Sequence, residues 1–98
     1  MKIVVVSGGF DPIHSGHIAY IKAARKLGDK LIVALNSDAW LTRKKGQPFM
    51  SFDERKEILE NLKAVDEVIG FFDSDGSCCD ALEQIKLTYY GNQIIFCN

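Results

Sequence analysis

The sequence predicts an α/β fold in which a parallel β-sheet lies between layers of helices. Short runs of β-branched and apolar residues recur along the chain, and they are apolar at successive positions, which suits strands buried on both faces. Segments with apolar residues at helical spacing separate these runs. The alternation of strands and helices implies right-handed crossovers between parallel strands. A length of 98 residues fits one domain.

The first half of the chain predicts two strands and two helices. The first strand, KIVVVS, covers residues 2–7. The segment HSGHIAYIKAARKLGD follows with helical spacing, Ser15 as its expected N-cap and Gly28 where a C-terminal cap belongs. KLIVALN, residues 30–36, predicts the second strand, and a short helix is expected from about residue 38 to residue 41.

The second half predicts two further pairs of helix and strand. KKGQPF, residues 44–49, is expected to be a loop. In the helical segment SFDERKEILENLKAV, residues 51–65, Ser51 precedes Glu54 by three positions, which is a capping-box pattern. A strand, a turn rich in Asp and Gly, a helix and a last strand then follow at residues 65–72, 73–77, 78–90 and 93–98.

Composition excludes several classes of protein. The chain is 47% hydrophobic and 26% charged with a net charge of −1, so neither disorder nor a nucleic-acid partner is expected. No apolar run is long enough to cross a bilayer, and we expect no membrane partner. Cys78, Cys79 and Cys97 show no metal-binding spacing, which indicates reduced thiols in a cytoplasmic protein.

The segment SGGFDPIHSGH, residues 7–17, follows the first strand and holds both histidines of the chain. Gly8 and Gly9 allow a phosphate or ribose to approach the backbone closely. The spacing matches neither the G-x-G-x-x-G fingerprint nor the Walker loop. Because ligands of open parallel sheets bind beyond the carboxyl ends of the strands, this segment is the first candidate for a binding site.

His14 and His17 are three residues apart at the start of the predicted helix, so their rings are expected on the same side. Two imidazoles beside free N–H groups would form a donor cluster for an anion, as phosphoryl and nucleotidyl transfer require. Three alternatives stay open: histidines on the surface of a loop, metal ligands with Asp11 as a third ligand, or a structural domain in which the histidines have no function.

The segment GGFDPIHSGH resembles the H-x-G-H signature of the nucleotidyltransferase superfamily that includes the cytidylyltransferases. The segments LGDKLIVALNSD, FDERKEIL and AVDEVI are similar to that group in the same order, so the resemblance covers residue 1 to about residue 70. Glycerol-3-phosphate cytidylyltransferase and the nucleotidyltransferase domain that forms ADP-heptose are the members it most resembles. The resemblance implies a Rossmann-like three-layer α/β/α fold.

The resemblance also implies a reaction. In the family, the paired histidines contact the nucleotide phosphates and stabilise the transition state at the α-phosphate; here these would be His14 and His17. The substrates would be a nucleoside triphosphate, CTP or ATP, and a small phosphorylated alcohol or sugar. Mg²⁺ would bridge triphosphate oxygens, and pyrophosphate would be released. A homodimer is compatible with this family.

Further site residues follow from the same resemblance. Gly8, Gly9 and Phe10 would border the nucleotide, and Phe10 would also pack. Asp11 would hold the acceptor or orient the loop.

Two cationic positions are expected at the substrate. Lys44 matches a phosphate-binding lysine of the family, and Lys45 is the only substitute for a second family lysine, which would fall on Gly46. A mobile loop carrying both lysines would close over the phosphates, unless it is a plain solvated loop. Arg55 would reach substrate phosphate or form a surface ion pair with Glu54 or Glu57.

The sequence departs from the family pattern after its fourth strand. Family members continue into a segment that grips the base and triphosphate, whereas this sequence ends at IIFCN. Residues 1–98 are therefore expected to be a nucleotidyltransferase domain lacking its C-terminal part. An alternative is a nucleotide-binding fragment without catalytic activity.

Overall fold

A computed structural model describes residues 1–74 and 78–97, which form four strands and four helices. The elements follow one another in the expected order, including the two helices between the second and third strands. In chain order they are β1 (Lys2–Gly8), α1 (Ser15–Arg25), β2 (Lys30–Leu35), α2 (Asp38–Lys45), α3 (Phe52–Glu60), β3 (Glu67–Gly70), α4 (Cys79–Thr88) and β4 (Gln93–Cys97).

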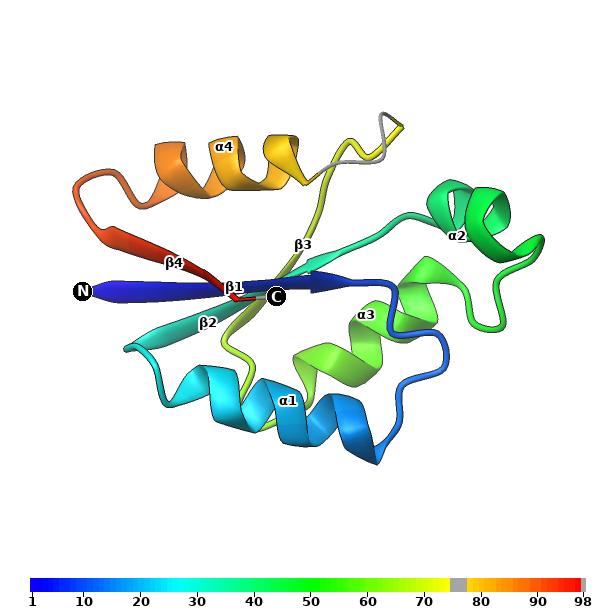
Figure 1. The fold of residues 1–98 in the computed structure, drawn as a ribbon, viewed down its shortest axis with the longest axis horizontal. Coiled ribbons are helices and arrows are strands. Elements are labelled where there is room, and N and C mark those ends of the chain that lie inside the picture. Colours follow the sequence, from blue (N-terminus) through cyan, green and yellow to red (C-terminus); the bar gives the residue numbers. More distant parts are fainter. Residues whose placement is uncertain (75–77, 98) are drawn as a thin grey trace.

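The four strands form one parallel sheet in the order β3-β2-β1-β4. Val5 in the central strand pairs with Ile32 on one side and with Phe96 on the other. Helices α1 and α3 cover one face of the sheet and α4 covers the opposite face (Figure 1). The predicted three-layer α/β/α arrangement is therefore confirmed.

Two apolar clusters hold the layers together, and successive residues of β1 serve them alternately. Val4 and Val6 are buried against α1 and α3, in the cluster that contains Ile21 and Leu59. The intervening side chains belong to a second cluster on the face of α4, which consists of Ile3, Val5, Ile32, Ala34, Ala81 and Ile85. Burial on both faces explains why this strand has no polar residue from Ile3 to Val6.

Helix α2 is longer than the sequence predicts, and this changes the environment of the lysines. It extends to Lys45, so Lys44 and Lys45 lie in its last turn and not in a loop. Three basic residues in that turn complement the negative end of the helix dipole. Gly46, with φ of 90°, ends the helix by donating its N–H to the Thr42 carbonyl.

Other boundaries shift by a few residues. Helix α3 starts as expected, with the Ser51 Oγ accepting the Glu54 N–H at 3.3 Å, but it ends at Glu60. The third strand is limited to residues 67–70. The turn expected over 73–77 lies partly outside the described residues, as does the end of the last strand at residue 98.

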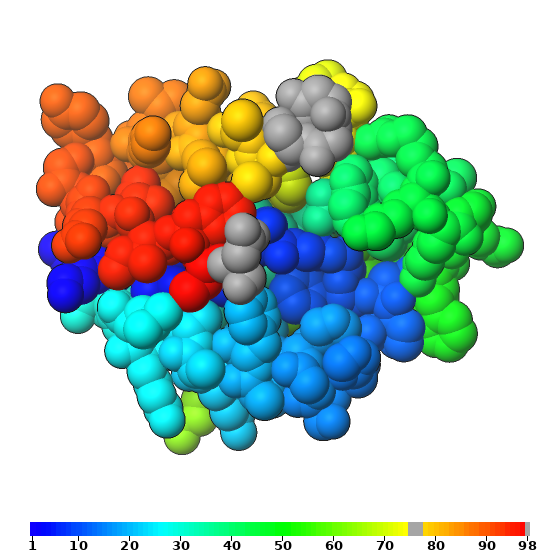
Figure 2. All heavy atoms as spheres, in the orientation of Figure 1, coloured from blue at the N-terminus to red at the C-terminus, as the bar shows by residue number. Residues whose placement is uncertain are grey.

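The loop after β1 and the segment after α2 meet at one end of the molecule. In the space-filling view, β4 crosses the middle of the visible face between α4 and α1, and the segment after β1 adjoins the segment after α2 (Figure 2). The contacts between Asp11 and Phe49 described below join these same two segments. This meeting point is where the candidate site is built.

Candidate functional site

The site lies at the carboxyl end of β1, where the order of the strands reverses. The chain moves from β1 to β2 and β3 on one side, then returns to place β4 on the other side of β1. The covering helices change faces accordingly, with α1 below the sheet and α4 above it in Figure 1. Ligands of open α/β sheets bind at such a switch point, so the loop after β1 occupies the expected place.

His14 and His17 together form the start of helix α1. The N-cap is His14 and not Ser15 as predicted: the His14 Nδ1 accepts the Gly16 N–H at 3.0 Å. In return, the His17 Nδ1 accepts the His14 N–H at 3.2 Å, which completes a capping box made of two imidazoles. The Gly16 N–H is therefore bonded to a ring and does not face a ligand.

The two rings are stacked, with centroids 3.9 Å apart, which confirms that they lie on the same side. Because each Nδ1 accepts a backbone N–H, a neutral ring carries its proton on Nε2. Burial lowers the pKa of His17, and the nearby His14 lowers it further. The pair therefore combines two Nε2–H donors with a bias toward the neutral form of His17, which suits hydrogen bonding to an anion.

The loop that precedes the histidines has an unusual backbone. Phe10 has φ of 49°, a conformation that costs free energy for a bulky side chain. Its ring is buried in the core below the sheet and meets His17 edge-on at 5.0 Å between centroids. The packing role predicted for Phe10 is thus present, and it also fixes the position of the His17 ring.

Gly9 is required by its neighbours in α2. A Cβ atom built on Gly9 would lie 2.8 Å from the Leu41 Cδ2 and 3.5 Å from the Trp40 ring. At Gly8 the corresponding atom would lie 3.2 Å from the Phe10 ring. The two glycines therefore allow close packing within the protein around the loop.

The Asp11 carboxylate connects the loop after β1 to the segment after α2. Its Oδ2 accepts the Phe49 N–H at 2.6 Å and lies 2.7 Å from the Lys45 Nζ, while its Oδ1 accepts the Met50 N–H at 2.5 Å. Burial acts to raise the pKa of Asp11, but the bonds from Lys45, Phe49 and Met50 outweigh it, and the pKa is lowered. Of the two roles predicted for Asp11, orienting the loop is the one that these contacts serve.

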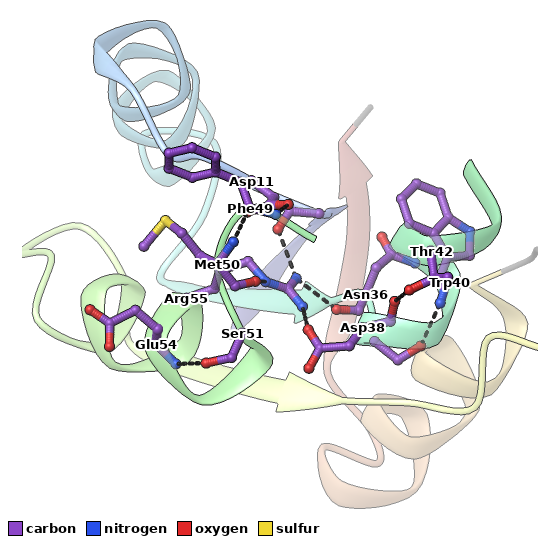
Figure 3. A network of polar contacts seen from close by, with 12 residues as sticks. Asp11, Asn36, Asp38, Trp40, Thr42, Phe49, Met50, Ser51, Glu54 and Arg55 are labelled. Atoms are coloured by element: carbon purple, nitrogen blue, oxygen red, sulfur yellow. Dashed lines mark hydrogen bonds and ion pairs between the residues drawn. The ribbon is translucent and has the colours of Figure 1, made fainter. Parts of the chain in front are cut away.

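Arg55 occupies the centre of the network in Figure 3 and is only 1% exposed. Its guanidinium donates to the Gly9, Asn36 and Met50 carbonyls and pairs with the Asp38 Oδ1 at 2.7 Å. The predicted surface ion pair with a neighbouring glutamate is wrong, because the side chain points into the protein from α3.

The three basic residues at the end of α2 have different partners. Lys45 is held by Asp11, whose backbone oxygen also accepts its Nζ at 2.7 Å. The Lys44 Nζ lies 4.7 Å from the centroid of the Trp40 ring. Arg43 donates to the Asp73 carbonyl at 2.8 Å. Lys44 and Lys45 are both exposed, so solvated phosphate groups can reach them without unfolding any element.

Sequence reasoning missed a second buried carboxylate, Asp73. It accepts the Ser37 N–H at 2.8 Å, the Ser37 hydroxyl at 2.7 Å and the Asn36 amide at 3.2 Å. These bonds, with the charge of Arg43, outweigh burial and lower the pKa of Asp73. Asn36 and Ser37 lie at the end of a predicted strand, and this position was the only sequence signal for a site there. No sequence pattern indicated that Asp73, 36 residues beyond Ser37, would be their partner.

The carboxylates near the site offer little to a protein-bound cation. Within residues 1–74 and 78–97, no group of three or more His, Cys, Asp or Glu side chains is placed to hold a metal ion. Asp11, Asp38 and Asp73 are each hydrogen-bonded to protein donors. The described residues therefore provide no ready-made site for a resident Mg²⁺.

The described helices are too short or too polar to include a membrane span.

Comparisons with known proteins identify relatives of this chain. Residues 5–90 match the cytidylyltransferase-like family. The bifunctional protein HldE of Pseudomonas savastanoi pv. phaseolicola is 51% identical over 87 residues, which cover 87% of this chain and 18% of that protein. HldE of Yersinia enterocolitica is 50% identical over 72 residues, or 71% of this chain and 15% of the relative. The chain thus spans about a fifth of the length of these relatives.

A solved structure extends the similarity to the whole chain. The lipopolysaccharide core biosynthesis protein of Thermoplasma volcanium has a TM-score of 0.73 and 25% identity, and the alignment covers 100% of this chain and 97% of that one. A protein from Archaeoglobus fulgidus shares the fold, with a TM-score of 0.62 and 18% identity. The match over residues 5–90 and the identities to HldE place this chain in the cytidylyltransferase-like family.

Proposed function

We propose that this chain is a nucleotidyltransferase domain that moves a CMP or AMP group from a nucleoside triphosphate to a small phosphorylated alcohol or sugar. A phosphate oxygen of the acceptor attacks the α-phosphorus of the triphosphate. The bond from that phosphorus to the β-phosphate oxygen breaks, and pyrophosphate leaves with the bonding electrons. No covalent intermediate with the protein forms, and a magnesium ion enters bound to the triphosphate.

The observation that carries this proposal is the stacked pair of His14 and His17. The ring centroids are 3.9 Å apart, so the pair presents two Nε2–H donors side by side at the N-terminus of a helix. This arrangement favours an anion whose charge increases during the reaction. Since both Nδ1 atoms are occupied by backbone N–H groups, the rings donate hydrogen bonds and need not transfer protons. Lys44 and Lys45 supply the positive charge that the leaving pyrophosphate requires.

The acceptor is proposed to be a sugar phosphate. Support comes from the solved relative of Thermoplasma volcanium, whose name assigns it to the biosynthesis of lipopolysaccharide core, a carbohydrate. Pyrophosphate release measured separately with CTP and with ATP identifies the nucleotide. Lys45 would exchange its contact with Asp11 for substrate phosphate, whereas Asp11 would keep its two backbone bonds.

The test is pyrophosphate release with CTP or ATP, magnesium and a panel of phosphorylated sugars and alcohols. His14→Asn keeps a short polar side chain that caps helices well but removes the Nε2 donor. We expect His14→Asn and His17→Ala each to lower the rate about a hundredfold or more, as the loss of one transition-state donor does elsewhere. Ser15→Ala, at an exposed position between the histidines, is the matched control and should keep its rate.

Two outcomes would contradict the proposal. Turnover that survives both histidine substitutions would show that the pair does not act on the phosphates. Nucleotide binding without pyrophosphate release, for every acceptor in the panel, would favour a nucleotide-binding module that lacks catalytic activity.

A further inference from the structure

Arg55 is the bulkiest of the fully buried side chains in the described part of the protein. A guanidinium cannot lose its proton, so its burial is tolerated only where carbonyls and carboxylates surround it. Nη1 donates to Gly9 O at 2.9 Å and to Asn36 O at 2.8 Å, and Nε donates to Met50 O at 3.1 Å. Nη2 donates to Asp38 Oδ1 at 2.7 Å.

These four partners come from three separate segments of the chain. Gly9 follows β1, Asn36 follows β2, Asp38 begins α2 and Met50 precedes α3. Figure 3 shows the guanidinium between these segments, with dashed lines running to each side. A single side chain therefore joins the loop that leads to the histidine pair to the junction between β2 and α2 and to the segment before α3.

The bond to Gly9 has a specific geometric consequence. The peptide between Gly9 and Phe10 is trans, so its C=O and N–H point in opposite directions. Because Arg55 holds the carbonyl from the side of α3, the Phe10 N–H points away from α3. No hydrogen bond to this N–H is found among residues 1–74 and 78–97.

Phe10 also needs an external constraint. Its φ of 49° is unfavourable for a side chain other than glycine, and such conformations persist where surrounding contacts fix them. The buried ring fixes one side of the residue, and the Arg55 bond fixes the peptide that precedes it.

We propose that Arg55 is a positioning residue of the phosphate site, which orients the Gly9–Phe10 peptide so that the Phe10 N–H donates to a phosphate oxygen. This inference rests on the proposed function for the nature of the ligand. Lysine cannot replace the arginine, because one ammonium cannot reproduce a planar fork that reaches three carbonyls and a carboxylate.

The experiment uses inorganic tripolyphosphate as the probe and the protein labelled with [¹⁵N]phenylalanine, which gives one amide signal for each of the six phenylalanines. The Phe10 signal is identified by its absence in Phe10→Tyr. In the unsubstituted protein, tripolyphosphate should shift this signal. Arg55→Lys should raise the Kd about tenfold or more and abolish the shift, because an oriented donor to a charged group is lost.

Arg25→Lys is the matched control. Arg25 also donates to a backbone carbonyl, that of Gly28, and pairs with Asp66, but it lies at the opposite end of the sheet. It should keep both the Kd and the Phe10 shift. An Arg55→Lys protein that binds and shifts like the unsubstituted protein would overturn the proposal.

A second variant decides the question if Arg55→Lys does not fold. Asp38 is 47% exposed, and Asp38→Asn weakens the grip on the guanidinium without emptying a buried site. It should raise the Kd about threefold and reduce the Phe10 shift, whereas Asp53→Asn, at an exposed position in the first turn of α3, should not. Equal behaviour of the two asparagine variants would overturn the inference.

The proposed function can fail separately. A Phe10 shift that depends on Arg55, in a protein that releases no pyrophosphate from any substrate pair, would support the positioning role and contradict the transferase. The absence of any tripolyphosphate binding by the unsubstituted protein would overturn both.

Discussion

The two ends of the sheet are both held by ion pairs, but the pairs differ in burial and in what they hold. At the carboxyl end, Arg55 and Asp73 are buried; Arg55 bonds mainly to backbone carbonyls of loops, and Asp73 accepts bonds from Asn36 and Ser37 just after β2. At the amino end, Lys30 and Glu67 join the starts of β2 and β3 through Tyr89, and their side chains are 28% and 37% exposed.

The difference shows which part of the molecule needs fixed loops. The amino-end pairs connect elements that the sheet and the core already place, since β2 and β3 are paired along their length. The carboxyl-end pairs connect loops that have no strand partners of their own. Charge is thus buried where it orients a site, and left half-exposed where it only supplements packing.

Replacing one arginine at each end tests this comparison most strongly. Arg55→Met leaves three carbonyls without their donor and should lower the free energy of unfolding by about 3–5 kcal/mol. Arg25→Met removes a pair that is about one-third exposed and should cost less than about 1 kcal/mol. Urea unfolding followed by circular dichroism measures both. Equal losses would show that the two ends do not differ.

The stabilisation at the two ends of the sheet should depend on pH in opposite directions. The pKa of Asp73 is lowered from 3.8, so its stabilisation is present above pH 3.8 and is lost as the pH falls through the folded-state value. The pKa of Lys30 is raised from 10.5, chiefly by its hydrogen bond to Tyr89, so its stabilisation is present below pH 10.5 and is lost above it.

Asp73→Asn should therefore lower stability by about 1–3 kcal/mol at pH 7, and the difference should shrink below pH 3.8. Lys30→Met should cost about 1 kcal/mol or less at pH 7, and its difference should shrink above pH 10.5. Unfolding curves at low, neutral and high pH check both. A difference for Asp73→Asn that stays constant through the acid range would contradict the assignment.

The smallest expected effect concerns His17. Burial and the nearby His14 lower its pKa below 6.5, so its contribution to stability is present above pH 6.5 and is lost as the pH falls toward the folded-state value. Protonation of Nδ1 would also remove the acceptor of the His14 N–H. An NMR titration of the ring protons should give a midpoint below 6.5, which rises in His14→Asn. An unchanged midpoint in that variant would show that the rings do not interact.

Much of this architecture could be predicted from the sequence. The apolar runs gave all four strands, and the spacing of His14 and His17 placed their rings together. The sequence did not predict hydrogen bonds between side chains and groups far away along the chain. Arg55 was expected on the surface of α3 because its nearest acidic neighbours lie on the same helix. Its real partners are 5 to 46 residues away.

The predictions of the N-cap of α1 and of a loop carrying Lys44 and Lys45 were wrong for local reasons. Ser15 is the better N-cap by residue preference, but the His14 ring reaches the Gly16 N–H, and His17 completes the box. The extension of α2 through Lys45 depends on the positive φ of Gly46, which the sequence allows but does not require.

The capping box formed by His14 and His17 at the start of α1 makes the fold and the proposed function depend on the same two residues. In most helices the atoms that cap the first turn and the atoms that bind a ligand belong to different residues, so either can mutate alone. Here Nδ1 of each ring serves the helix while Nε2 is left for a ligand. A codon change at position 14 or 17 that replaced the ring by a side chain unable to cap the helix would affect the secondary structure and the proposed chemistry in one step, and natural selection would act on both together.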